Sequence, residues 1–199
     1  MVFHKYKLIV IGVPKNASSS LFDALKNQTD RDHTHETIIE TFHTQDNDLM
    51  ELYTSLAVVR NPYDRFFSAC HQIRRDSEEN QKLTIGEIIG QEILNRNHYN
   101  DVFQSQHRYI SIGSKVLIDK IFKYETLNED WKEFAEEFNK TSQFPIPSFL
   151  PKSNVSSQKE PWEKDILLLN QDQLDLINHL YTKDFKLFGY EMIKKIPTT

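Results

Sequence analysis

The sequence is poor in cysteine, in glycine and in long hydrophobic runs. Its single cysteine, Cys70, excludes an internal disulfide and lacks the Cys/His spacing of a zinc site, which favours a reducing compartment. The apolar run near the start, residues 8–13, is too short for a signal-peptide core or a membrane span. We therefore expect a cytoplasmic protein without a membrane span.

Positive charge is also in short supply. The chain has 24 lysines and arginines against 29 acidic residues, a formal net charge of -5, so no basic field steers it to nucleic acid or to an anionic membrane. Its 199 residues, 38% of them hydrophobic, can bury one sizeable core. We expect one domain over residues 1–199, in which local groups must hold any anionic ligand.

Buried strands alternate with amphipathic helices along the chain. Apolar, β-branched runs at residues 8–11 and 56–59 are typical of strands in a parallel sheet, and helical patterns follow over residues 18–26 and from Pro62 onward. The further elements expected are a strand at 120–124, helices around 85–93, 131–138 and 174–181, and an irregular segment over 142–161. This order predicts an α/β fold with a mainly parallel sheet and helices on both faces.

The segment between the first strand and the first helix has the composition of an anion-binding loop. Backbone N–H groups and the positive end of the helix dipole meet at this edge of the sheet, and Lys15 adds a point charge. It is not a nucleoside-triphosphate P-loop, because a second glycine and a lysine directly before the helical serine are missing. The candidate ligand-binding residues are Pro14, Lys15, Asn16, Ala17, Ser18, Ser19 and Ser20.

A second strand-to-helix junction carries an arginine and a serine. Arg60 at the strand end can hold a phosphate with two parallel hydrogen bonds, and Ser68 on the following helix can donate a third. Arg65 lies on the same helix, where an arginine is expected to face solvent or pair with an acid. The junction therefore predicts a second phosphate site.

Together these two segments resemble a known enzyme family. Residues 14–21 are similar to the 5'-phosphosulfate loop, and residues 58–69 to the 3'-phosphate motif, of sulfotransferases that use 3'-phosphoadenosine 5'-phosphosulfate (PAPS). The branch is that of the carbohydrate sulfotransferases and their soluble bacterial and viral relatives. The resemblance implies a P-loop-like sulfotransferase fold, PAPS as cosubstrate without a metal, and an acceptor hydroxyl on a carbohydrate. Looser similarity covers residues 121–127 and much of the chain after 150.

The resemblance also implies catalytic roles. Lys15 would stabilise charge on the leaving phosphate, and His35, followed by Thr37, aligns with a histidine of the family and is our candidate general base. His107 is a second candidate. The segment 154–159 aligns with a loop that covers the nucleotide in the family.

Three alternatives are weighed against this interpretation. A metal site built from the cluster at residues 32–37 is not expected, because no HExxH helix accompanies it. A P-loop-type small-molecule kinase would share the architecture but needs a metal-binding acid. A non-catalytic nucleotide-binding module would keep Arg60 and Ser68 without a working base.

Overall fold

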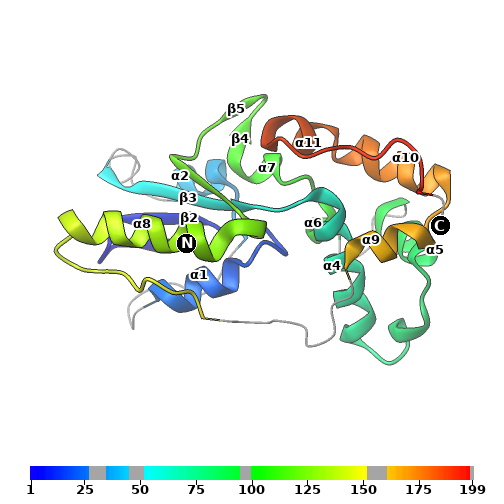
Figure 1. Ribbon diagram of the computed structural model, residues 1–199, viewed down its shortest axis with the longest axis horizontal. Helices are drawn as coiled ribbons and strands as arrows, with labels where there is room; N and C mark the ends of the chain where they lie inside the picture. The colour runs from blue at the N-terminus through cyan, green and yellow to red at the C-terminus, as the bar shows by residue number, and fades with distance from the viewer. Residues whose placement is uncertain (27–34, 45–51, 95–99, 152–160, 198–199) are drawn as a thin grey trace. The chain divides into compact units, whose positions relative to one another are not determined.

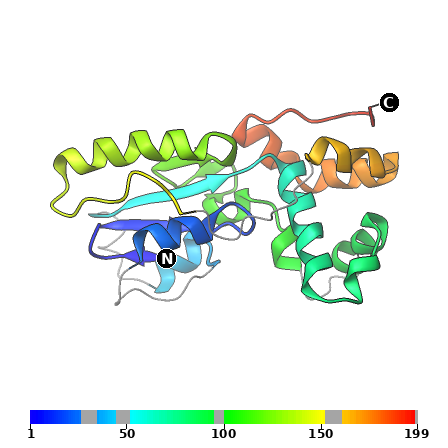
Figure 2. The ribbon, with the colours of Figure 1, turned by 60° about the horizontal axis from the view of Figure 1, so that its bottom comes forward.

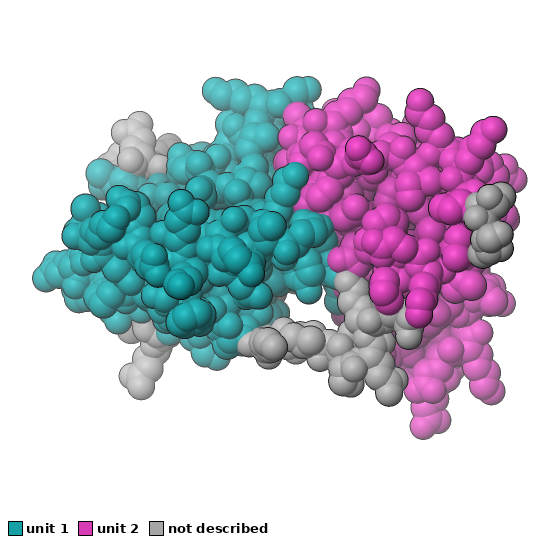
Figure 3. All heavy atoms as spheres, in the orientation of Figure 1, with its two compact units in different colours: residues 1–60, 107–156 teal, residues 61–106, 157–199 magenta. Residues whose placement is uncertain are grey.

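The structure is a computed structural model that describes residues 1–26, 35–44, 52–94, 100–151 and 161–197 (Figure 1). The chain divides into two compact units, drawn in different colours in Figure 3. Unit 1 comprises residues 1–60 and 107–156, and unit 2 comprises residues 61–106 and 157–199. The expectation that residues 1–199 act as one domain stays a prediction. Within the described ranges, no helix is both long and apolar enough to cross a membrane.

Unit 1 contains the predicted sheet, with four strands in the order β1–β2–β3–β6. The strands are β1 (Val2–Phe3), β2 (Leu8–Ile11), β3 (Thr54–Val59) and β6 (Lys120–Lys123). β3 lies between β2 and β6 and is parallel to both, whereas β1 runs antiparallel to β2. The expected α/β class with a mainly parallel sheet is confirmed, and the carboxyl ends of three strands share one edge.

Both faces of this sheet are buried, which explains the uninterrupted apolar runs of its strands. One face packs against α1 (Ser18–Leu25) and α8 (Leu127–Thr141), and α8 runs along the strands in Figures 1 and 2. The residues that share this core are Leu8, Val10, Leu21, Leu25, Leu56, Val58, Phe122, Trp131 and Ala135. The alternate strand residues, Ile9, Ile11, Ala57 and Val59, are buried on the opposite face.

Smaller elements complete unit 1. Helix α2 (Ile38–Thr44) contacts the short helix α7 (His107–Ile110), and the latter leads into a hairpin of β4 (Ser111–Ile112) and β5 (Lys115–Val116). Gly113 adopts a φ of 63° in the turn of this hairpin, a conformation that favours glycine. The turn η3 (Tyr124–Thr126) connects β6 to α8.

Unit 2 is helical in its described residues. Its elements are α4 (Pro62–Asp76), η1 (Asn80–Lys82), α5 (Ile85–Ile88), the π-helix η2 (Ile89–Leu94), α6 (Asn100–Phe103), α9 (Trp162–Asp165), η4 (Ile166–Leu168), α10 (Gln171–Leu180) and α11 (Thr182–Phe188). The hydrophobic core of the unit includes Phe66 and Phe67 of α4 together with Leu174 and Ile177 of α10.

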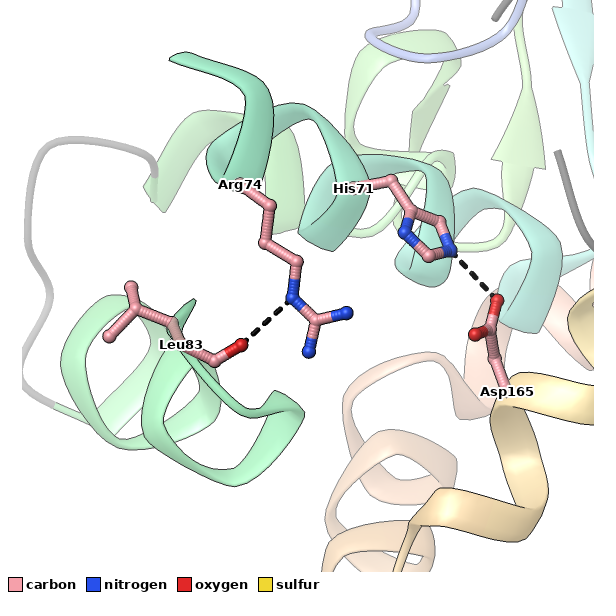
Figure 4. Close-up of polar contacts among 4 residues, drawn as sticks. All are labelled: His71, Arg74, Leu83 and Asp165. Carbon is pink, nitrogen blue, oxygen red and sulfur yellow. Dashed lines mark hydrogen bonds and ion pairs between the residues drawn. The ribbon is translucent and has the colours of Figure 1, made fainter. Parts of the chain in front are cut away.

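Polar contacts fix the neighbours of α4, as Figure 4 shows. His71 Nε2 lies 2.8 Å from Asp165 Oδ2 at the end of α9, and Arg74 Nε donates to the carbonyl oxygen of Leu83 at 2.8 Å. The ring of Trp162, at the start of α9, stacks on Tyr63 of α4 at 5.4 Å between centroids. Helix α9 is therefore attached to α4 at both of its ends.

Arg65 does not face solvent, which was one of the two alternatives expected for this residue. Its side chain is buried in unit 2, and Nη2 donates to the carbonyl oxygen of Val102 at 2.9 Å. The charges of Arg65 and Asp184 both act on Tyr181, whose pKa is raised chiefly by burial. The carbonyl oxygen of Val102 gives this buried guanidinium a hydrogen-bond acceptor.

Candidate functional site

The segment between β2 and α1 forms a tight loop at the carboxyl edge of the sheet. Pro14 and Asn16 are buried, and the Asn16 N–H donates to the carbonyl oxygen of Val13 at 3.3 Å. Lys15 and Ala17 adopt φ angles of 69° and 59°, the left-handed region that residues other than glycine rarely enter. The loop therefore stores backbone strain at two of the predicted ligand-binding positions.

This strained backbone has the geometry that binds anions elsewhere. Left-handed residues that alternate with ordinary ones turn successive N–H groups toward a common concavity, and such concavities bind phosphate and related anions. Helix α1 begins directly afterwards, at Ser18, and its N-cap, Ala17, supplies no side-chain hydrogen bond. An anion at the first turn can accept hydrogen bonds from the N–H groups that a side-chain cap would otherwise satisfy.

The three serines lie in the first turn of α1. Ser18 and Ser20 are buried, with 6% and 9% of their surfaces exposed, and Ser19 is half-buried. Of the three serines, Ser19 is therefore the most accessible to solvent. The roles predicted for these serines remain predictions.

Asn16 holds the loop against the sheet. Its side-chain Nδ2 donates to the carbonyl oxygen of Val58 at 2.8 Å, and only 1% of the residue is exposed. Sequence reasoning placed Asn16 among the ligand-binding residues and did not anticipate this contact with β3. The contact gives its side chain an anchoring role, while a role of its backbone in ligand binding stays a prediction.

Arg60 links the two predicted phosphate segments. It follows the last residue of β3, and its Nη1 donates to the carbonyl oxygen of Lys15 at 2.7 Å. The guanidinium carbon lies 4.0 Å from the centroid of the Tyr124 ring, and 3% of the residue is exposed. The structure thus brings the Arg60 guanidinium to the backbone of Lys15 at one edge of the sheet.

His35 lies next to the same loop. Its Nδ1 is 2.6 Å from the carbonyl oxygen of Gly12. Because a carbonyl can only accept a hydrogen bond, Nδ1 carries the proton in this contact, and in the neutral ring Nε2 is then the nitrogen that can accept one. This is the tautomer that a general base needs.

Local sequence explains how His35 is held there. Thr37 Oγ1 accepts a hydrogen bond from the Glu40 N–H, and the Glu40 carboxylate accepts one from the Thr37 N–H, so the two residues form a capping box for α2. Hydrogen bonds from the backbone N–H and from the side chain of Thr37 to the Glu40 carboxylate lower the pKa of Glu40. The start of α2 is fixed two residues after His35, which limits the positions open to the imidazole.

The remaining predicted residues are Ser68 and His107. Ser68 is half-buried on α4 in unit 2, where Asn61 caps the helix by accepting from the Tyr63 N–H at 2.9 Å. Its part in a phosphate site stays a prediction. His107 is half-buried at the start of α7 in unit 1, and Ser111 Oγ donates to its carbonyl oxygen. The segment expected to cover the nucleotide, 154–159, lies outside the described residues.

Tyr124 is the site residue that sequence reasoning missed. It lies within residues 121–127, a segment with looser similarity to the family, but was assigned no role. The available signal was its position, since it directly follows β6 as Arg60 directly follows β3. As for metals, the described part of the chain contains no group of three or more His, Cys, Asp or Glu side chains that could hold an ion, and His33 lies outside that part.

A comparison with protein families identifies one enzyme family. A family model described as "Sulfotransferase family" matches residues 1–191. A solved structure of a sulfotransferase from Alicyclobacillus acidocaldarius is similar at 13% identity and a TM-score of 0.36, over 95% of this chain and 90% of that one. No curated protein matches the chain.

Proposed function

The chain belongs to the sulfotransferase family, and from this premise we propose that it transfers the sulfuryl group of PAPS to a hydroxyl of a carbohydrate acceptor. The observation that carries the proposal is the hydrogen bond from Arg60 to the Lys15 carbonyl oxygen. It joins the loop suited to one anionic group with the arginine suited to another. PAPS carries two such groups, the 5'-phosphosulfate and the 3'-phosphate.

The 5'-phosphosulfate would bind at the loop of residues 14–20. Backbone N–H groups of the left-handed turn and of the first turn of α1 would donate to its oxygens, with the hydroxyls of the serines as further donors. Lys15 would lie where negative charge grows on the leaving phosphate, and a preorganised cation stabilises that charge in the transition state. Arg60, with Ser68, would hold the 3'-phosphate.

His35 would accept the proton of the acceptor hydroxyl. As the acceptor oxygen forms its bond to sulfur, the bond between sulfur and the bridging oxygen of the 5'-phosphate breaks. Adenosine 3',5'-bisphosphate leaves with that electron pair, and the acceptor proton moves to Nε2 of His35. The hydrogen bond from Nδ1 to Gly12 supports this role, because it sets the required tautomer and steadies the imidazolium once it forms.

The proposal also covers the acceptor and the location of the protein. The carbohydrate preference rests on the sequence resemblance to carbohydrate sulfotransferases. A cytoplasmic location is supported by the single cysteine, Cys70, which is buried and leaves no second thiol for a disulfide within the chain. No metal is needed in the proposed reaction, because the adenosine bisphosphate is already a good leaving group.

The decisive experiment is calorimetric binding of adenosine 3',5'-bisphosphate in the presence of a chelator. We expect binding without metal, and Arg60→Ala should weaken it by about 1.5–3 kcal/mol, the value of a charge-assisted contact. Loss of binding in the chelator, or tighter binding of ATP with magnesium, would favour a kinase instead. Binding without turnover on any hydroxyl acceptor, measured with labelled PAPS and mass spectrometry, would indicate a non-catalytic module.

A further inference from the structure

The carboxyl ends of β3 and β6 bring an arginine and a tyrosine together. In the parallel pair of β3 and β6, Val59 lies opposite Lys123. Arg60 and Tyr124 are therefore the residues that directly follow this pair on the two strands. The guanidinium carbon of Arg60 lies 4.0 Å from the centroid of the Tyr124 ring. This is well within the distance at which an arginine and an aromatic face attract each other. The contact is thus a direct product of strand register.

Two contacts of different kinds act on the same guanidinium. The Tyr124 ring attracts it through its π face, and the Lys15 carbonyl oxygen accepts from Nη1 at 2.7 Å. Arg60 is 3% exposed, so water screens these contacts little. The aromatic face and the hydrogen bond, acting from two different groups, together restrict the orientation of the guanidinium.

The ring of Tyr124 is itself held in place. It belongs to the partly buried side chains that pack on the unit 1 core, and η3 directly follows β6. An arginine side chain has several rotatable bonds, and bidentate binding of a phosphate requires its N–H groups to point in fixed directions. A rigid aromatic platform supplies that restriction before a ligand arrives, which lowers the ordering cost of binding.

We propose that Tyr124 is a positioning residue that orients the Arg60 guanidinium for the 3'-phosphate of the nucleotide. The inference rests on the proposed function, since it takes Arg60 as the 3'-phosphate ligand. In this proposal the Tyr124 ring strengthens binding of the 3'-phosphate alone, and it does so through Arg60. Binding of the rest of the nucleotide should not depend on this stack.

The test compares two nucleotides that differ only in the 3'-phosphate, adenosine 3',5'-bisphosphate and adenosine 5'-monophosphate. Tyr124→Leu should weaken binding of the bisphosphate by about three- to thirtyfold while changing the monophosphate less than about twofold. Tyr124→Phe keeps the aromatic face and should bind both nucleotides like the parent protein. Tyr124→Met serves as the aliphatic replacement if the leucine variant does not fold, as judged by thermal unfolding.

Arg60→Ala provides the reference for the ratio of the affinity for the bisphosphate to the affinity for the monophosphate. Since Tyr124 acts through Arg60, adding Tyr124→Leu to Arg60→Ala should cause no further loss of bisphosphate binding. Equal weakening of both nucleotides by Tyr124→Leu would overturn the proposal, because the ring would then contact the nucleotide directly. The proposal would also be overturned if Tyr124→Leu left the ratio of bisphosphate to monophosphate affinity unchanged while Arg60→Ala lowered that ratio. If Arg60→Ala itself leaves the ratio unchanged, the proposed function fails at its 3'-phosphate ligand.

Discussion

Replacing Asn16 tests whether the loop before α1 depends on its attachment to the sheet. The side chain is 1% exposed and donates to the Val58 carbonyl oxygen at 2.8 Å. Asn16→Ala removes this donor and leaves no side-chain group that can replace it. The change leaves Lys15 and the serines of α1 chemically intact, so any effect on them acts through the position of the loop.

The expected loss of stability follows from the burial of both partners. Val58 is 2% exposed, so its carbonyl oxygen cannot easily exchange the lost donor for water. Removing one partner of a buried hydrogen bond costs about 1–3 kcal/mol. For a chain of this size, each kcal/mol corresponds to a decrease in Tm of about 2–4 °C. The same variant should also weaken binding of adenosine 3',5'-bisphosphate, because the strained loop loses an anchor.

Thermal and urea unfolding, followed by circular dichroism, measure the effect. Asn128→Ala is the matched control, since Asn128 is exposed on α8 and the same substitution there should change stability by less than about 0.5 kcal/mol. If Asn16→Ala unfolds at the same temperature and denaturant concentration as the parent protein, the attachment contributes nothing and the reasoning is refuted.

Asn16→Asp sharpens this test by adding a pH dependence. The introduced carboxylate would be buried and would face a carbonyl oxygen, so its pKa in the folded state would be raised above its unfolded value. The folded state would then bind the proton more tightly than the unfolded state. The variant should therefore be relatively most stable below the unfolded pKa of about 3.9 and lose stability as pH rises through the folded pKa. A pH-independent difference from the parent protein would contradict the assigned contact.

The remaining predictions concern catalysis and the buried thiol. His35→Ala should reduce turnover by about a hundredfold to ten-thousandfold with binding of the product nucleotide nearly unchanged, whereas a normal rate, with His107→Ala inactive, would transfer the role of base to His107. Lys15→Ala should lower turnover by roughly a hundredfold or more and affinity for the product nucleotide by less; equal losses would limit Lys15 to ground-state binding. Burial raises the pKa of the Cys70 thiol. The contribution of the protonated thiol to the free energy of unfolding is therefore fully present below the ordinary thiol pKa and is lost as pH rises above it. Alkylation of Cys70 should accordingly be slow at pH 8 and become fast in denaturant; fast labelling of the folded protein would contradict its burial.

Much of the α/β framework could be predicted because its elements are marked by local pattern. The run at 8–11 is the strand β2, and the run at 56–59 lies inside β3, which begins two residues earlier at Thr54. Pro62 is the first residue of α4, as the tolerance of proline in a first helical turn indicates. Strands that are buried on both faces appear in the sequence as uninterrupted apolar runs. A strand with one face in solvent would instead alternate apolar and polar residues, which is harder to recognise over four residues.

Elements whose stability comes from tertiary contacts were missed. The pattern around 174–181 correctly predicted a helix, which is α10, but helix α11, which has only seven residues and begins at Thr182, was not predicted. The two-residue strands β4 and β5 are too short to show alternation. The four isoleucines around 85–93 predicted one amphipathic helix, whereas the structure divides it into α5 and a π-helix, which shifts the hydrogen-bond register without changing the composition.

The candidate site shows the same division between local and tertiary information. Lys15 and Arg60 could be selected from sequence because a charged residue next to a strand end is a local feature. The partners of Asn16 and Arg60 could not, since they depend on which strands are neighbours and in which register. Once β3 is known to lie between β2 and β6, the contact between Arg60 and Tyr124 follows from counting residues along the pair.

The strain of the loop and the position of Arg60 are parts of one arrangement. Lys15 and Ala17 occupy left-handed conformations that glycine would adopt at less cost, but a glycine at 15 would remove the charge that the loop presents. The strained turn is held by contacts at two neighbouring positions, from Asn16 to β3 and from the Lys15 carbonyl oxygen to Arg60. Since Arg60 donates to the backbone of the loop, a shift of the loop must also change the environment of its guanidinium. The sites proposed for the two anionic groups of the nucleotide therefore meet at a single hydrogen bond, in which the loop contributes its backbone and the 3'-phosphate site contributes the guanidinium.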